Sequence, residues 1–146
     1  MEAGRTSEIW ARTTLRLWPE HYVLASLEPG LLGRAAALAG RAKGTFVALL
    51  LERDEVSLVV SEELWNGGAL EAGCRAVARP FRVLTLDCDV DLEVTGYFAP
   101  AAERLARAGI PIVPACGYLK DHILVREQDA GRALAVLEEL IAESRA

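Results

Sequence analysis

The stretch GIPIVPACGYLKDHILVR, residues 109–126, decides the expected fold. Ile110–Ala115 and His122–Arg126 have the apolar pattern of strands, and the turn Gly117–Lys120 joins them as a hairpin. The two prolines of the first strand remove backbone donors that a central strand needs. We therefore expect Ile110–Ala115 at the edge of a sheet.

Helices flank this hairpin, and the same order of elements recurs in the first half of the chain. Phe98, Ala102, Leu105 and Ala108 share one helical face, and a last helix is expected over Asp129–Ala142. The other expected elements are a weak strand Thr13–Leu17, strand Tyr22–Leu27, helix Leu31–Ala42, strands Thr45–Leu51 and Glu55–Val60, a short helix with Leu70, Cys74 and Val77 on one face, and strand Arg82–Asp87.

This order predicts an α+β protein made of two tandem ferredoxin-like βαββαβ units, with antiparallel sheets and helices on one face. We expect a frayed N-terminus over 1–11, a first unit over 12–80 and a second over 81–146. Two complete units need more strands than the pattern supplies. Either the halves share a strand or a partner chain provides one.

Composition excludes several classes of function. The chain is 52% hydrophobic and 25% charged, which indicates a folded core, and its net charge of −5 argues against nucleic acid as a partner. No apolar run is long enough for a membrane span, and no secretory signal is visible. Three well-separated cysteines favour reduced thiols in the cytoplasm. Two distant histidines argue against a metal site.

Three segments of the second half carry a family resemblance: EVTGYFA (93–99), AGIPIV (108–113) and CGYLKDHILV (116–125). The segment ERDEVSLVVSEE (52–63) of the first half has a similar pattern. In this order the chain resembles the ACT-domain family, and more specifically its aspartate-kinase-like subfamily, which includes cytosolic arginine sensors. The resemblance extends from Tyr22 to Ile141.

The turn that opens the Phe98 helix is the candidate ligand site. Such a turn presents unpaired backbone N–H groups and the positive end of the helix dipole to an anion. Gly96 permits close approach of a ligand, and Pro100 gives up a donor that has no partner inside the helix. The resemblance implies ligand-binding roles for Thr95, Gly96, Tyr97, Phe98, Ala99, Pro111, Ile112, Val113 and Asp121.

Some residues favour other interpretations. Thr95–Ala99 could be an ordinary turn, and Asp121 could bond its own backbone. Cys116, Gly117 and Lys120 replace hydroxyl residues of the family pattern, and Lys120 could neutralise Asp121. Cys116, His122 and Asp121 could be imagined as a nucleophile with its base, but a structural thiol is the preferred interpretation. The three tryptophans, Trp10, Trp18 and Trp65, are expected to pack.

The sequence therefore predicts a regulatory protein that binds a small molecule, an amino acid in particular, with no catalytic residues, metal or cofactor. A homodimer is expected because edge strands invite pairing. The alternative is a ligand-free module that uses the same fold for dimerisation.

Overall fold

The computed structural model describes residues 2–146, and side chains from residue 4 onward. The chain forms two compact units. The middle unit is Trp18–Arg82, and the terminal unit combines the residues up to Leu17 with Val83–Ala146. This differs from the expected division at 80/81, because the N-terminal segment packs with the C-terminal half.

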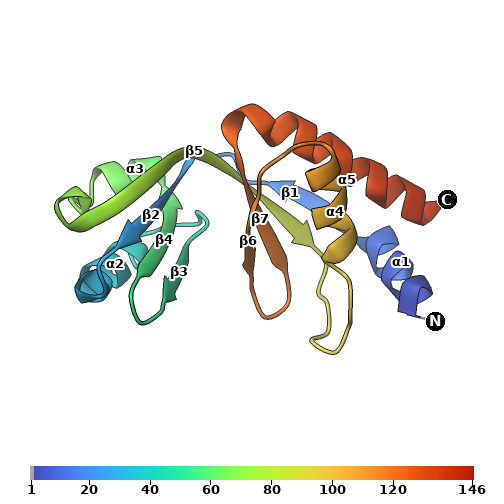
Figure 1. Ribbon diagram of the computed structural model, residues 1–146, viewed down its shortest axis with the longest axis horizontal. Helices are drawn as coiled ribbons and strands as arrows, with labels where there is room; N and C mark the ends of the chain where they lie inside the picture. The colour runs from blue at the N-terminus through green and yellow to red at the C-terminus, as the bar shows by residue number, and fades with distance from the viewer. Residues whose placement is uncertain (1) are drawn as a thin grey trace. The chain divides into compact units, whose positions relative to one another are not determined.

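The middle unit has helices on one face of a four-stranded antiparallel sheet (Figure 1). The strands lie in the order β3-β4-β2-β5. Its elements are β2 (Tyr22–Leu27), a 3-10 turn (Pro29–Leu31), α2 (Leu32–Ala39), β3 (Ala48–Leu51), β4 (Val56–Ser61), α3 (Glu62–Asn66), a second 3-10 turn (Glu71–Gly73) and the first part of β5 (Cys74–Asp87).

Alternate side chains of the strands form the core of this unit. Successive side chains point to opposite faces of a sheet, so every second residue can meet the helices. The buried cluster contains residues from β2 and β4 together with residues from both helices: Val23, Ala25, Leu27, Val56, Leu58, Val60, Ala35, Leu38 and Trp65.

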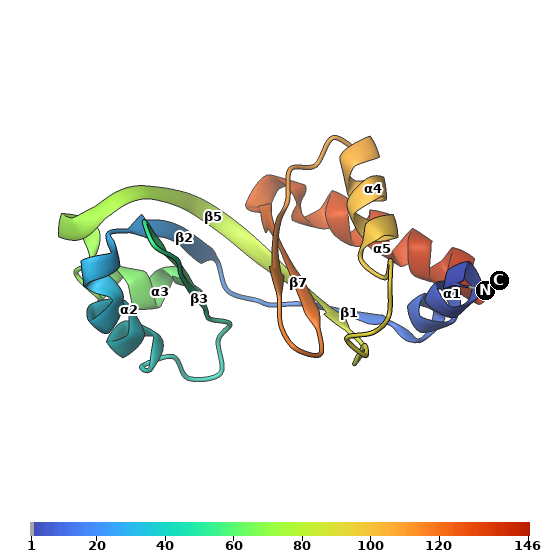
Figure 2. The same ribbon diagram turned by 60° about the horizontal axis from the view of Figure 1, so that its bottom comes forward.

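The terminal unit has strands in the order β1-β5-β7-β6, with α4 and α5 on one face (Figure 2). Its edge strand β6 carries Pro114, which confirms the expected edge position. The elements are α1 (Glu2–Arg12), β1 (Thr14–Leu17), the end of β5, α4 (Ala99–Arg107), β6 (Val113–Cys116), β7 (Asp121–Arg126), a 3-10 turn (Glu127–Asp129) and α5 (Ala130–Arg145).

The first described residues, from Glu2 onward, are helical, and the expectation of frayed structure there was wrong. α1 buries Ile9 and Trp10 in the same cluster as Leu105 of α4 and Leu137 of α5. The guanidinium Nε of Arg145 also donates to the carbonyl of Ala11, 2.8 Å away. Polar residues dominate α1, and the two apolar residues near its end decide where it packs.

The expected short helix around Leu70–Val77 was also wrong, because strand β5 begins at Cys74. Ala76 and Ala78 pair with Ser26 and Leu24 of β2, so tertiary pairing overrides the weak helical stripe. The pattern had missed the helix α3, which begins at Glu62 and is capped by Ser61, whose side-chain oxygen accepts from the N–H of Leu64, 3.3 Å away.

Both units have the ferredoxin-like βαββαβ arrangement, which confirms the predicted fold class. In the middle unit the first part of β5 is the fourth strand, beside β2. In the terminal unit the end of β5 is the first strand, and β1 from the chain start takes the fourth place beside it. β5 therefore contributes strand pairing to both units. Among the described residues, no helix is long and apolar enough to cross a membrane.

Candidate functional site

The turn before α4 has the geometry that a backbone binding site requires. Gly96 has φ +76°, a conformation that glycine adopts without strain, and no atom would lie within 4 Å of an added Cβ. Phe98 is the N-cap of α4, and its side chain makes no capping hydrogen bond. The first amides of α4 have no partner inside the helix.

This turn forms one wall of a cavity of about 340 Å³, which we call the turn cavity. The hairpin between β6 and β7 forms a second wall, and the loop after β5 forms a third. The cavity therefore brings the α4 turn and Asp121 together, although they are far apart in the sequence. The lining residues are Val90, Asp91, Leu92, Val94, Gly96, Tyr97, Phe98, Ala99, Cys116, Gly117, Tyr118, Leu119 and Asp121.

Four predicted residues do not line the turn cavity. Pro111 and Ile112 precede β6, which begins at Val113, and Ile112 packs partly against the core of the unit. Thr95 instead lines a second cavity of about 610 Å³, which we call the helix cavity. Its walls come from α1, α4 and α5, and Gly96 and Ala99 line both cavities.

The Tyr97 side chain belongs to the core. It is 5% exposed, and its ring stacks on Trp10 with centroids 4.8 Å apart. The hydroxyl oxygens of Tyr97 and Thr13 lie 2.7 Å apart. Burial raises the pKa of Tyr97 to about 12, and the hydrogen bond with Thr13 opposes that rise. Tyr97 therefore positions the turn through its side chain.

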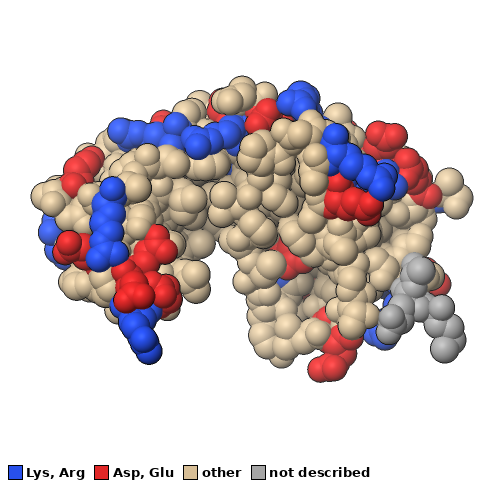
Figure 3. Space-filling model, in the orientation of Figure 1, with Lys and Arg blue, Asp and Glu red and all other residues tan. Residues whose placement is uncertain are grey.

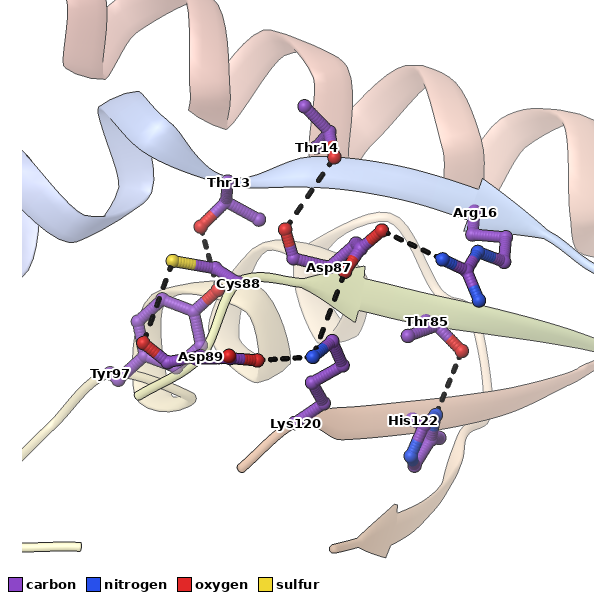
Figure 4. A network of polar contacts seen from close by, with 10 residues as sticks. All are labelled: Thr13, Thr14, Arg16, Thr85, Asp87, Cys88, Asp89, Tyr97, Lys120 and His122. Atoms are coloured by element: carbon purple, nitrogen blue, oxygen red, sulfur yellow. Dashed lines mark hydrogen bonds and ion pairs between the residues drawn. The ribbon is translucent and has the colours of Figure 1, made fainter. Parts of the chain in front are cut away.

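Lys120 does not neutralise Asp121. Its ammonium pairs with the carboxylate of Asp89 and lies 3.9 Å from that of Asp87, which in turn accepts from Arg16 at 2.9 Å (Figure 4). Among the described residues, none forms an ion pair with Asp121. Its carboxylate is half-buried and available to a ligand cation.

Cys116 and His122 are not arranged as a nucleophile and its base. Cys116 is the cross-strand partner of Asp121, whereas His122 is the next residue on β7 and points to the opposite face of the sheet. Nδ1 of His122 lies 2.8 Å from the Thr85 hydroxyl, and burial lowers the pKa of His122. Burial and then the nearby Asp121 raise the pKa of the Cys116 thiol, which works against nucleophilic reactivity.

The loop wall of the turn cavity was missed by the sequence reasoning. Residues 88–98 connect β5 to α4, and the N–H of Val90 donates to the carbonyl of Leu119, 2.9 Å away, which ties this loop to the hairpin. The acidic run Asp87, Asp89 and Asp91 and the length of this connection were the available signals. Asp91 and Asp121 are the charged side chains of the lining.

Surface charge and metal ligands add little to this site. In the described part of the chain, no cluster of three or more histidine, cysteine or acidic residues could hold a metal ion. Figure 3 shows acidic and basic side chains interspersed on the face drawn. The electrostatics that matter are therefore local to the turn cavity, where helix amides face two carboxylates.

Comparison with known proteins agrees with the fold. Residues 76–139 match the model of the ACT domain family. No sequence among the curated proteins matches the chain. The Vibrio cholerae protein of unknown function, described as a possible transport protein, is similar in structure, with a TM-score of 0.75, 25% identity and coverage of 97% of this chain and 99% of the other.

Two further solved structures are similar at lower identity. A protein from Agrobacterium tumefaciens has a TM-score of 0.69 and 21% identity, with 88% of this chain and 89% of that one covered. The regulatory subunit of aspartate kinase from Thermus thermophilus, in its ligand-free form, has a TM-score of 0.63 and 16% identity, with 88% and 97% covered. These likenesses establish an ACT-like, ferredoxin-type fold. The finer resemblance to arginine sensors stays a prediction.

Proposed function

We propose that this chain is a regulatory protein that binds a free amino acid in the turn cavity. One observation carries the proposal: the cavity joins the uncapped start of α4 to the carboxylate of Asp121, which forms no ion pair with the described residues. An amino acid presents a carboxylate and an ammonium group close together. The two walls offer complementary partners for both charges.

Each wall has a distinct chemical role. The ligand carboxylate accepts hydrogen bonds from the amides at the start of α4, where the helix dipole is positive. Gly96 keeps that approach open, because it has no side chain and nothing occupies the space of a Cβ. The ligand ammonium donates to Asp121. Lys120 does not compete, because Asp89 and Asp87 hold it.

The size of the cavity suits a small ligand. Its volume of about 340 Å³ lies near the lower end of ordinary ligand pockets, which span roughly 300–1,000 Å³. The apolar side chains of Val90, Val94 and Phe98 in its lining can contact the ligand side chain. The similar fold of an aspartate kinase regulatory subunit supports a regulatory role.

Regulation follows if the ligand favours one arrangement of the chain, because preferential binding shifts the population toward that arrangement. In this proposal the protein works in the cytoplasm as a homodimer and carries out no reaction of its own.

Isothermal titration of the full chain with each standard amino acid tests the proposal. We expect one of them, or a few related ones, to bind. Asp121→Asn should weaken that binding about tenfold or more, since a hydrogen bond to a charged group contributes about 1.5–3 kcal/mol. Asp54→Asn is the matched control, because Asp54 is exposed on a turn of the middle unit. Absence of heat and of a melting shift with every amino acid would remove the proposal.

The alternative function is dimerisation without a ligand. Three large apolar residues at the mouth of the turn cavity favour it, because Leu92, Tyr118 and Leu119 are 64%, 76% and 47% exposed. This alternative predicts that Tyr118→Ser dissociates the dimer in sedimentation experiments. It also predicts that amino acids leave both the dimer and the melting temperature unchanged.

A further inference from the structure

We propose that α1 is a regulatory latch of the turn cavity, and that Trp10 is the positioning residue through which it acts. This inference rests on the proposed function, because it concerns the control of the same site. α1 docks on the opposite side of the turn that supplies the ligand-binding amides. Its docking and the binding of a ligand are therefore energetically coupled.

Contacts between α1 and the turn carry the inference. The indole N–H of Trp10 donates to the carbonyl of Tyr97, 2.8 Å away, and the two rings stack. The hydroxyl of Thr6 donates to the carbonyl of Thr95, 3.4 Å away. α1 thus holds the carbonyls of the turn. The amides at the start of α4 remain for the ligand.

Thr13, just after α1, adds a directional contact. Its hydroxyl donates to the carbonyl of Ile9 at 2.9 Å. The same hydroxyl lies 2.7 Å from that of Tyr97, and the two share a hydrogen bond. Trp10 therefore contacts the carbonyl and the ring of Tyr97, and Thr13 contacts its hydroxyl.

The cavities lie on either side of this turn. Gly96 and Ala99 line both the turn cavity and the helix cavity, whose walls include Thr6 and Trp10. A shift of α1 would therefore move residues that face the ligand. The backbone of Gly96 is especially responsive, because glycine has the widest conformational freedom.

α1 can undock without unfolding the rest of the unit. It has 11 residues, and a helix of that length is marginal in water without tertiary contacts. Its attachment depends on Ile9, Trp10 and the hydrogen bond from Arg145 to Ala11. Such segments open locally at a lower free energy than the whole domain. Linkage then requires that a ligand that orders the turn also strengthens the docking of α1.

Hydrogen exchange of the ligand-free chain tests whether α1 holds the turn before α4 in place. Trp10→Phe keeps an aromatic ring but removes the donor to Tyr97. We expect faster exchange of the amides from Tyr97 to Ala101 in this variant. Trp65→Phe is the matched control, because Trp65 is equally buried, lies in the middle unit and has an indole N–H without a partner. Equal exchange at the turn in both variants and the wild type would overturn the latch.

Titration tests the coupling, with the standard amino acids as probes. Whichever amino acid binds the wild type should slow exchange across residues 4–12, and Trp10→Phe should weaken its binding about fivefold, the value of one net hydrogen bond. Trp65→Phe should leave the affinity unchanged. If an amino acid binds but α1 exchange and Trp10→Phe affinity do not change, the latch is wrong and the proposed function stands. If none binds, the proposed function fails, and the exchange experiment alone decides whether α1 holds the turn.

Discussion

The two units share a fold but differ where the first strand meets the first helix. In the middle unit, the single residue Glu28 separates β2 from the 3-10 turn that leads into α2. In the terminal unit, residues 88–98 separate β5 from α4. This longer connection folds against the β6–β7 hairpin and supplies the third wall of the turn cavity.

The hairpins differ in one contact. Both hairpin turns close with the same backbone hydrogen bond, from the N–H of Glu52 to the carbonyl of Glu55 and from the N–H of Gly117 to the carbonyl of Lys120, each 2.9 Å long. The terminal hairpin in addition bonds to the loop after β5, because the carbonyl of Leu119 accepts from the N–H of Val90. The comparison teaches that the fold repeats whereas the candidate site depends on one connection.

Alkaline pH should have the largest effect on the free energy of unfolding, and the effect should be similar in the two units. Burial raises the pKa values of Tyr22 in the middle unit and Tyr97 in the terminal unit from 10.0 to about 12. Unfolded tyrosine ionises first as the pH rises, so the free energy of unfolding should fall between pH 10 and 12, by about 2 kcal/mol for each residue. Urea unfolding at stepped pH measures this.

The two phenylalanine variants assign the alkaline loss to each unit. Tyr22→Phe and Tyr97→Phe should each remove their own share of the pH dependence. An unchanged slope in either variant would show that the tyrosine of that unit is not protected from ionisation.

The buried tryptophans should distinguish the units at neutral pH. Trp10→Phe leaves the carbonyl of Tyr97 without its donor, whereas Trp65→Phe removes an indole N–H that has no partner. We expect Trp10→Phe to lower the free energy of unfolding by about 1–2 kcal/mol more than Trp65→Phe. Chemical denaturation measures both, and equal losses would contradict the importance of the Trp10 hydrogen bond.

Two glycines provide a pair with equal strain. Gly96 in the terminal unit and Gly44 in the middle unit both have φ +76°, and neither has an atom within 4 Å of an added Cβ. Alanine at either position should cost about 1 kcal/mol of stability. Thermal unfolding should show similar losses, but titration should show weaker amino-acid binding for Gly96→Ala alone. If Gly44→Ala weakened amino-acid binding as well, the loss of binding would not be specific to the turn cavity.

The smallest expected effect concerns the thiols. Burial and the neighbouring Asp121 raise the pKa of Cys116, so its alkylation at neutral pH should be slow. Asp121→Asn should lower that pKa and accelerate the alkylation of Cys116, whereas Cys74 in the middle unit should react at its original rate. Mass spectrometry of iodoacetamide-treated protein measures both sites. An unchanged alkylation rate at Cys116 would contradict the effect of Asp121 on the pKa of its thiol.

Motif order in the sequence pointed to two walls of the turn cavity but not to the third. The Gly96 turn and Asp121 were identified from motif order, and the structure brings them to one cavity. Pro111, Ile112 and Val113 do not reach it, because the chain from α4 to β6 passes along the core. The loop wall at Val90–Val94 has no regular periodicity, so local pattern could not place it against the hairpin.

Local chemistry in the sequence determined most of the strands and the edge strand, because alternation and proline act over a few residues. β2 was expected at Tyr22–Leu27 and lies there. Only tertiary structure decided that Cys74–Asp87 is one strand that pairs in both units, and that α1 packs against α5. Those outcomes depend on contacts between residues far apart in the sequence, such as Leu24 with Ala78 and Trp10 with Tyr97, which no local pattern encodes.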